Sequence, residues 1–256
     1  MELLHSNVLG QGDPLIVLHG FLGMSDNWKT LGKKYAANGY EVHLIDQRNH
    51  GRSFWSEDFD YSAMAADLLQ YMDSKNLDRP IILGHSMGGK TAMHLACSNP
   101  DRVSKLLVAD IAPREYPPHH EYILRALEAL PLDQLKSRSE ADEALSETIE
   151  NWGIRQFLLK NLYWKAPGEL GLRINLAVLK NKMKEIGEPL GEGFRYKGPT
   201  AFIRGGASDY VSDSDRLLIL QHFPRAVVIT LEGAGHWLHA EQPEAFLRES
   251  LNFMKS

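Results

Sequence analysis

The chain has 256 residues, with 28 lysines and arginines against 33 aspartates and glutamates, which gives a net charge of −5 with neutral histidines. This length suits one or two domains, and large α/β folds often use it as one. A mildly negative chain without a basic run argues against nucleic acid as the main partner. The one cysteine, Cys97, excludes an internal disulfide and leaves no cysteine cluster for zinc, so we expect neither a disulfide nor a metal site.

No segment typical of export or of a membrane span is recognisable. The first residues, Met1 to Ser6, lack the positive and the long apolar regions of a signal peptide. A run of about 18 apolar residues, which a transmembrane helix needs, occurs nowhere. Together with the single cysteine, these features predict a cytoplasmic protein without membrane insertion.

Short apolar runs bounded by turn residues recur along the chain. They cover residues 15–18, 42–45, 81–83, 106–109, 201–203 and 227–231. Most are too continuous for strands with one exposed face, and such runs are typical of parallel strands covered on both faces. Between them, 61–74 and 87–98 carry apolar residues at helical spacing. This alternation predicts an α/β fold with a mostly parallel, doubly wound sheet.

The alternation is interrupted once, between the strand that ends near Asp110 and the strand that starts near Pro199. This long stretch contains no convincing strand, and helical spacing links Ile154, Phe157 and Leu162. Long insertions in compact domains are usually functional, although a helical layer without a functional part is the alternative. We therefore predict one catalytic domain, with a core of residues 1–111 and 198–256 and a helical cap, or lid, of residues 112–197.

The most specific local motif is Gly84-His85-Ser86-Met87-Gly88, a G-x-S-x-G sequence between an apolar run and a helical pattern. A strand that turns sharply into a helix strains the turn residue, and side chains two positions before and after it would collide. Gly84 and Gly88 remove those collisions and leave the Ser86 hydroxyl exposed at the carboxyl end of the sheet. We predict that Ser86 is a nucleophile, and the alternative is a glycine-rich turn with an incidental serine.

A serine nucleophile needs a base that is held by a third group. In this type of fold the order along the chain is nucleophile, acid, then histidine. His236 lies in Gly233-Ala234-Gly235-His236-Trp237, directly after an apolar run, and is the predicted base. The nearby His239 leads into a final helix expected over 241–254, where it would orient the loop or face solvent.

Two carboxylates are candidates for the acid. Asp110 follows the run 106–109, and Asp209 follows the run 201–203, which is the more usual place for the acid in this fold. Either residue could instead be an ordinary loop carboxylate, and Asp209 could cap a helix over 214–222. The order of the residues along the chain permits both.

The developing oxyanion needs hydrogen-bond donors. His19-Gly20-Phe21-Leu22-Gly23 follows the first apolar run and has the form of a loop that supplies one of them. The backbone N–H of Phe21 would act together with that of Met87, the residue after the nucleophile. A tight turn at the end of a strand is the alternative interpretation of this segment.

Together these segments resemble the α/β-hydrolase superfamily. The resemblance rests on Leu18-His19-Gly20-Phe21, Asp46 to Ser53, Gly84 to Lys90, Asp110-Ile111-Ala112-Pro113 and Gly233 to His239. The middle three segments are similar to those of the YbfF-type small bacterial esterases. The resemblance covers nearly the whole chain and is weakest in the cap.

The resemblance implies a serine carboxylesterase with a helical cap and no cofactor, acting on short- to medium-chain acyl esters and as a candidate on acyl-CoA thioesters. In that group the acid comes from the strand before the cap, which matches Asp110. The position of Asp209 is usually not acidic there, so we favour Asp110 and keep Asp209 as a second candidate acid. The segment 46–53 is interpreted as a structural turn.

Substrate preference is less visible in the sequence. Trp152, Phe157, Tyr163 and Trp164 could line an apolar pocket under the cap, although aromatic residues at helical spacing more often form a core. A carbon–carbon bond hydrolase, a perhydrolase-like enzyme and a lactonase share the same triad, and a slow-turnover ligand-binding receptor is the alternative from another class. The expected partner is a small acyl ester, and the sequence does not indicate an oligomeric state.

Overall fold

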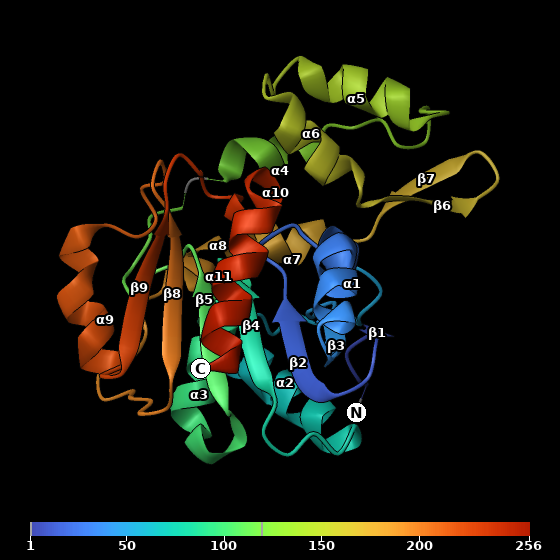
Figure 1. Ribbon diagram of the computed structural model, residues 1–256. Helices are drawn as coiled ribbons and strands as arrows, with labels where there is room; N and C mark the ends of the chain where they lie inside the picture. Colours follow the sequence, from blue (N-terminus) through green and yellow to red (C-terminus); the bar gives the residue numbers. More distant parts are fainter. Residues whose placement is uncertain (1, 119) are drawn as a thin grey trace.

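The computed structural model describes residues 2–118 and 120–256, which form a central seven-stranded sheet in the order β1-β3-β2-β4-β5-β8-β9 (Figure 1). All neighbouring pairs in this sheet are parallel except β1 with β3. The strands are β1 (Ser6–Leu9), β2 (Asp13–Leu18), β3 (Tyr40–Ile45), β4 (Ile81–His85), β5 (Lys105–Ala109), β8 (Thr200–Gly205) and β9 (Ala226–Leu231). Each predicted apolar run is a strand of this sheet, so the predicted α/β fold is confirmed.

Helices cover both faces of the sheet. One face carries α1 (Lys29–Ala37) and α11 (Pro243–Lys255), and the other carries α2 (Tyr61–Ser74), α3 (Met87–Ser98) and α9 (Arg216–His222). Leu15 and Val17 of β2 pack on the first face, whereas Ile16 and Leu18 pack on the second. Because both sets of side chains are buried, the strand reads as a continuous apolar run. The bounds of α2 and α3 agree with the predicted 61–74 and 87–98.

The predicted final helix over 241–254 is wrong at its start. The chain forms a short helix, α10 (Leu238–Glu241), and then begins α11 at Pro243. Proline has no N–H for a helical hydrogen bond and suits the first position of a helix, so it separates the two. Three short 3₁₀ helices complete the core: η1 (Ser25–Trp28), η2 (Pro100–Arg102) and η3 (Asp213–Asp215).

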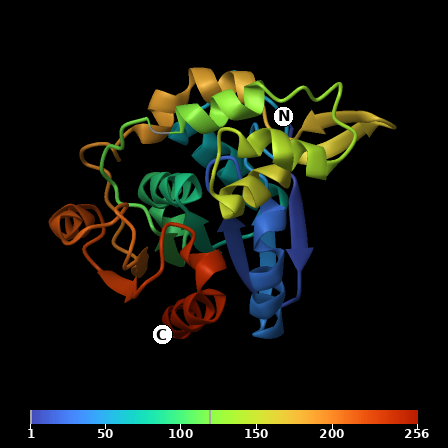
Figure 2. The ribbon, with the colours of Figure 1, turned by 90° about the horizontal axis from the view of Figure 1, so that it is seen from above.

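The segment between β5 and β8 lies over the carboxyl ends of the strands (Figures 1 and 2). It contains α4 (Glu121–Glu128), α5 (Arg138–Ser146), α6 (Trp152–Leu159), α7 (Leu176–Asn181) and α8 (Met183–Gly187), together with β6 (Leu162–Ala166) and β7 (Glu169–Leu172). Most of its buried apolar side chains form one cluster with those of Phe21, Met64 and Met87 from the core. The cap is therefore packed onto the region that carries the G-x-S-x-G motif.

The expectation of a cap without strands is wrong, because β6 and β7 form an antiparallel hairpin. The helical spacing that included Leu162 ends earlier, since α6 stops at Leu159 and Leu162 begins β6. Most of the hairpin is exposed, so it lacks the apolar run of a buried strand. Its sequence signal is Pro167-Gly168, where Gly168 has a φ of 82° that suits a turn. Within the described residues, no helix has the length and apolar character needed to cross a bilayer.

Candidate active site

Ser86 occupies the sharp turn between β4 and α3. Its φ of 53° and ψ of −119° are strained for a residue with a side chain. A Cβ atom on Gly84 would overlap the carbonyl of Gly88, and one on Gly88 would lie 2.6 Å from the carbonyl oxygens of Leu18 and His19. The two glycines therefore allow the turn, as the motif predicts, and Ser86 lies at the carboxyl end of β4.

His236 and Asp110 meet beside this turn, although 126 positions separate them in the chain. The Nδ1 atom of His236 lies 2.8 Å from Oδ2 of Asp110. Asp110 follows β5 with a φ of 50° and is completely buried, and His236 lies on the loop after β9. An ionised carboxylate can only accept hydrogen bonds, so Nδ1 of His236 carries the proton and Nε2 is the basic nitrogen of the neutral ring.

Two further donors hold the Asp110 carboxylate. The backbone N–H of Gly205 donates to its Oδ1 atom at 2.9 Å, and the hydroxyl of Ser208 donates to its Oδ2 atom. Burial raises the pKa of Asp110 to about 6, and the hydrogen bonds from Ser208 and Gly205 limit this rise. The carboxylate is therefore ionised above about pH 6.

Asp209 lies apart from this pair. Its side chain is exposed, and its backbone carbonyl accepts a hydrogen bond from Arg114. It does not cap α9 either, because η3 precedes that helix and the carboxylate of Asp215 accepts from the N–H of Ser212. Of the two candidate acids, the geometry brings Asp110 to His236.

Aromatic rings surround His236 on several sides. The ring of Tyr210 stacks on the ring of His236 with centroids 3.6 Å apart. Nε2 of His85 donates to the backbone carbonyl of His236 at 2.9 Å. His239 is buried and stacks on Trp28 with centroids 4.2 Å apart, so of its two expected roles the one in which it faces solvent is wrong. The sequence reasoning missed Tyr210 and the role of His85. The place of His85 beside the nucleophile was the only signal for it.

The loop His19 to Gly23 lies against Ser86. A Cβ atom on Gly20 would lie 3.3 Å from Cβ of Ser86, and both Phe21 and Met87 line the same pocket as Ser86. His19 fixes this loop, because its Nε2 atom accepts from the N–H of Gln47 at 3.0 Å and its Nδ1 atom donates to the carbonyl of Gly20 at 2.8 Å.

The segment 46–53 supports the same loop. Nε2 of His50 accepts from the N–H of Leu22 at 3.2 Å, and burial lowers the pKa of His50 to about 3, so its ring is neutral. The carboxylate of Asp46 accepts from the N–H groups of Ser25 at 2.6 Å and Arg52 at 2.9 Å. These contacts fit the interpretation of the segment as a structural turn.

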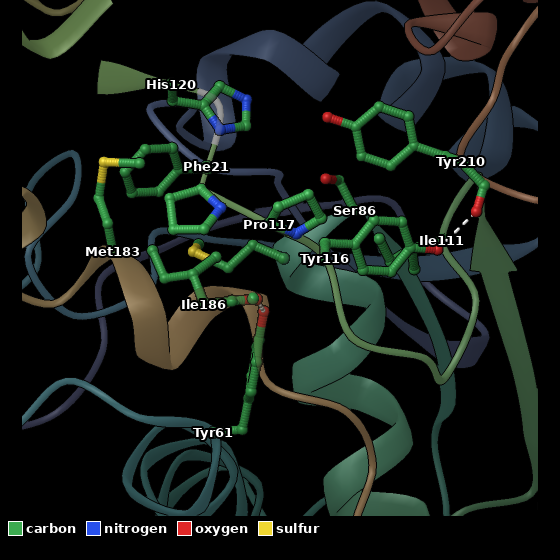
Figure 3. A pocket seen from close by; sticks show the side chains of 13 residues that line it. Phe21, Tyr61, Ser86, Ile111, Tyr116, Pro117, His120, Met183, Ile186 and Tyr210 are labelled. Carbon is green, nitrogen blue, oxygen red and sulfur yellow. Dashed lines mark hydrogen bonds between the residues drawn. The ribbon is translucent and has the colours of Figure 1, made fainter.

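A narrow, mostly apolar pocket of about 40 Å³, partly open to solvent, begins at Ser86 (Figure 3). Core residues such as Phe21 and Ile111 line it, and Figure 3 shows Met183 beside Phe21 and away from Ile111. The sequence reasoning missed most of the lining residues, among them five from distant segments: Tyr61, Tyr116, Met183, Ile186 and Tyr210.

A second pocket begins on the other side of Ser86. Both Ser86 and His236 line it, and it shares Phe157 and Trp237 with a larger groove between α6 and α10. Of the predicted pocket residues, Phe157 reaches this pocket and Trp152 lines the groove while 66% exposed.

The other two predicted pocket residues, Tyr163 and Trp164, lie on the hairpin strand β6. Neither is among the residues that line the two pockets at Ser86. Trp164 is 49% exposed, so it belongs neither to a pocket nor to the cap core. The prediction that these two residues line the substrate pocket is not supported.

The fold and the geometry of this site are those of a serine hydrolase, and comparisons with known proteins identify the family. The family model described as alpha/beta hydrolase fold matches residues 13–149. The protein named Esterase YbfF of Escherichia coli is 36% identical over 240 residues, which cover 92% of this chain and 90% of that protein. The protein named sn-1-specific diacylglycerol lipase ABHD11 of Mus musculus is 37% identical over 247 residues, which cover 94% of this chain and 80% of that protein.

A solved structure described as a marine microorganism esterase is similar over its full length. It is 41% identical, has a TM-score of 0.95 and covers 99% of this chain and 100% of that chain. The chain therefore belongs to the α/β-hydrolase superfamily, as an esterase-type serine hydrolase. The expected resemblance to the YbfF-type esterases is confirmed.

Proposed function

We propose that this protein is a serine carboxylesterase that hydrolyses short- to medium-chain acyl esters with Ser86 as nucleophile, His236 as base and Asp110 as acid. One observation carries the proposal. The imidazole that lines a pocket together with Ser86 is held at 2.8 Å by a buried carboxylate. This order of hydroxyl, imidazole and carboxylate is the arrangement that activates a serine.

In the proposed mechanism, Nε2 of His236 takes the proton of Ser86 as its hydroxyl attacks the ester carbonyl. The N–H groups of Phe21 and Met87 stabilise the negative oxygen of the tetrahedral intermediate. The imidazolium then protonates the leaving alcohol, and an acyl-enzyme remains on Ser86. Water attacks this acyl-enzyme with His236 again as the base, which releases the acid and restores the serine.

The two pockets at Ser86 suggest how an ester is placed. The apolar pocket with Met183 and Ile186 suits the acyl chain, whose burial is favourable. The second pocket, which leads to the groove between α6 and α10, suits the leaving group and its departure. Because this groove has room for a large leaving group, acyl-CoA thioesters remain within the proposed substrate range. We also propose that the protein acts in the cytoplasm on small esters, which is consistent with a single cysteine.

Rapid mixing with p-nitrophenyl esters tests this proposal. The wild type is expected to show a burst of p-nitrophenol close to one equivalent or steady turnover, and Ser86→Ala is expected to lose roughly a millionfold of the activity. A panel of acyl-CoAs measures thioester preference in parallel. Substantial turnover by purified, folded Ser86→Ala would overturn the assignment, and tight binding of esters without turnover would favour a receptor instead.

A further inference from the structure

Lys90 is a buried cation close to the nucleophile that the proposed chemistry does not use. It lies on α3 one turn after Ser86, and its backbone N–H donates to the carbonyl of Ser86 at 3.1 Å. Only 2% of its surface is exposed. An ammonium group that leaves water at such a cost needs compensating partners. Its partners therefore indicate what the residue does.

The partners of the ammonium group are carbonyls and aromatic rings. Nζ of Lys90 donates to the carbonyl of Gly187 at 3.1 Å and to that of Glu188, at the C-terminus of α8. A cation at this end of a helix is favourable because the last carbonyls carry partial negative charge. Nζ also lies 4.9 Å from the ring centre of Tyr116 and 5.7 Å from that of Tyr61.

These partners form one wall of the apolar pocket. Tyr61, Tyr116 and Gly187 all line it, and so does Ile186 (Figure 3). They also contact one another, because the hydroxyl of Tyr61 donates to the carbonyl of Ile186 at 2.7 Å and the N–H of Tyr116 donates to that of Gly187 at 2.8 Å. A Cβ atom on Gly187 would overlap the carbonyl of Tyr116, so the two segments are in close contact.

We propose that Lys90 is a positioning residue that fixes the far wall of the acyl pocket by tying α8 to the nucleophile helix α3. This inference rests on the proposed esterase function. The ammonium group links three segments that are distant in the chain, namely α2, the residues after β5 and the end of α8. An acyl chain that extends from Ser86 to Met183 and Ile186 is expected to contact more of this wall than an acetyl group does.

The positive charge of Lys90 strengthens its contacts with the end of α8 and with the rings of Tyr61 and Tyr116. Burial lowers the pKa of Lys90 to about 7, the nearby Arg114 lowers it further, and Glu188 and Glu115 oppose the shift. The neutral amine keeps N–H donors but loses its attraction to the two rings and to the helix terminus. The wall is therefore held more firmly below about pH 7 than above it.

Three neighbours of the ammonium group whose pKa values are shifted by burial keep one charge state between about pH 6 and pH 9. Burial lowers the pKa of His94, on the same helix, to about 4, so its ring is neutral throughout. Burial raises the pKa values of Tyr61 and Tyr116, so both stay uncharged. The carboxylates on the helices that pack around Lys90 are Asp60, Asp67 and Asp73 at the start and along α2, and Glu185 on α8.

The test compares p-nitrophenyl hexanoate with p-nitrophenyl acetate and uses the ratio of their kcat/KM values. The two esters share a leaving group, so ionisation of the triad cancels in this ratio. We expect Lys90→Met, which keeps the length of the side chain, to lower the ratio about tenfold, mainly through KM for the hexanoate. In the wild type the ratio is expected to fall severalfold between about pH 6 and pH 9, and in Lys90→Met it is expected to be independent of pH.

Lys105→Met is the matched control. Nζ of Lys105 donates to the carbonyl of Met254 at 2.7 Å, at the end of α11, and lies 5.9 Å from the ring centre of Phe253. The Lys105 ammonium group therefore makes the same kinds of contact away from the pocket. We expect Lys105→Met to keep the ratio of the two kcat/KM values within twofold of the wild type.

An unchanged ratio in Lys90→Met, or an equal change in Lys105→Met, would overturn the inference. If Lys90→Met fails to fold, the wild type alone provides the test. A ratio of the kcat/KM values for hexanoate and acetate that does not vary with pH would then overturn the inference. Absence of hydrolysis of both esters by the wild type would instead contradict the proposed function.

Discussion

Ser208 donates its hydroxyl to the carboxylate of Asp110, so the loop after β8 supports the proposed acid without supplying it. Asp209, the next residue, is exposed and is the carboxylate that the more usual order of the fold would select. The position after β8 thus supplies a hydroxyl donor, while the position after β5 supplies the carboxylate that holds His236.

This division of roles predicts different outcomes for two matched variants. Asp110→Asn is expected to lower kcat/KM for a p-nitrophenyl ester by about 10⁴-fold, because an amide at this position favours the wrong tautomer of His236. Asp209→Asn is expected to stay within about twofold of the wild type, as for an exposed loop residue. Steady-state kinetics of both variants decide the matter. A large loss in Asp209→Asn with little loss in Asp110→Asn would exchange the two assignments.

The buried carboxylate of Asp110 also predicts a dependence of stability on pH. Burial raises its pKa from 3.8 to about 6, so in this window the folded protein keeps a proton that the unfolded chain releases. Stability from this group is therefore lost as the pH rises from about 4 to above 6, by about 3 kcal/mol in total.

Asp110→Asn removes this titration. We expect the free energy of unfolding of the variant, relative to the wild type, to increase by about 3 kcal/mol between pH 4 and pH 8. Urea denaturation at several pH values measures this difference, and Asp209→Asn serves as the control. A difference between Asp110→Asn and the wild type that is constant with pH would show that Asp110 titrates normally.

The turn at Ser86 predicts that Gly88 does not tolerate a side chain. In Gly88→Ala the new Cβ atom would lie 2.6 Å from the carbonyl oxygens of Leu18 and His19, and backbone atoms cannot move aside easily. We expect a loss of several kcal/mol in the free energy of unfolding, or failure to fold.

Gly153→Ala is the control for this variant, because Gly153 is also the second residue of its helix, α6. A Cβ atom there would lie 3.2 Å from the side-chain oxygen of Asn151, and alanine favours the helix by about 1 kcal/mol. Thermal unfolding of both variants provides the comparison. A stable, fully active Gly88→Ala would contradict the close packing at the turn.

The core strands and the proximity of Asp110 to His236 were predictable from the sequence for a physical reason. Strands buried on both faces must be continuous apolar runs, and Ser86 and Asp110 each follow such a strand. His236 follows the edge strand β9, which is only partly buried but still has an apolar run in its sequence. Parallel strands place their carboxyl ends at one edge of the sheet, so residues that follow them meet there. This argument left two acids possible, since both Asp110 and Asp209 follow a parallel strand.

Elements with an exposed side were missed because they lack that signal. The edge strand β1 and the hairpin of β6 and β7 are only partly buried, so their sequences show no apolar run. The pocket was missed for another reason. Tyr61, Tyr116 and Tyr210 come together only through the packing of three distant segments, whereas the aromatic character of Trp152 and Trp164 did not reveal that both are largely exposed.

The most direct measurement is the site of covalent labelling by a fluorophosphonate, which reacts with an activated serine. Peptide mass spectrometry of the labelled wild type is expected to show one adduct per chain, on Ser86, together with loss of esterase activity. The rate of labelling is expected to fall strongly in His236→Gln and Asp110→Asn but not in Asp209→Asn. An adduct on another residue, or full esterase activity in protein labelled at Ser86, would contradict the assignment of Ser86 as the nucleophile.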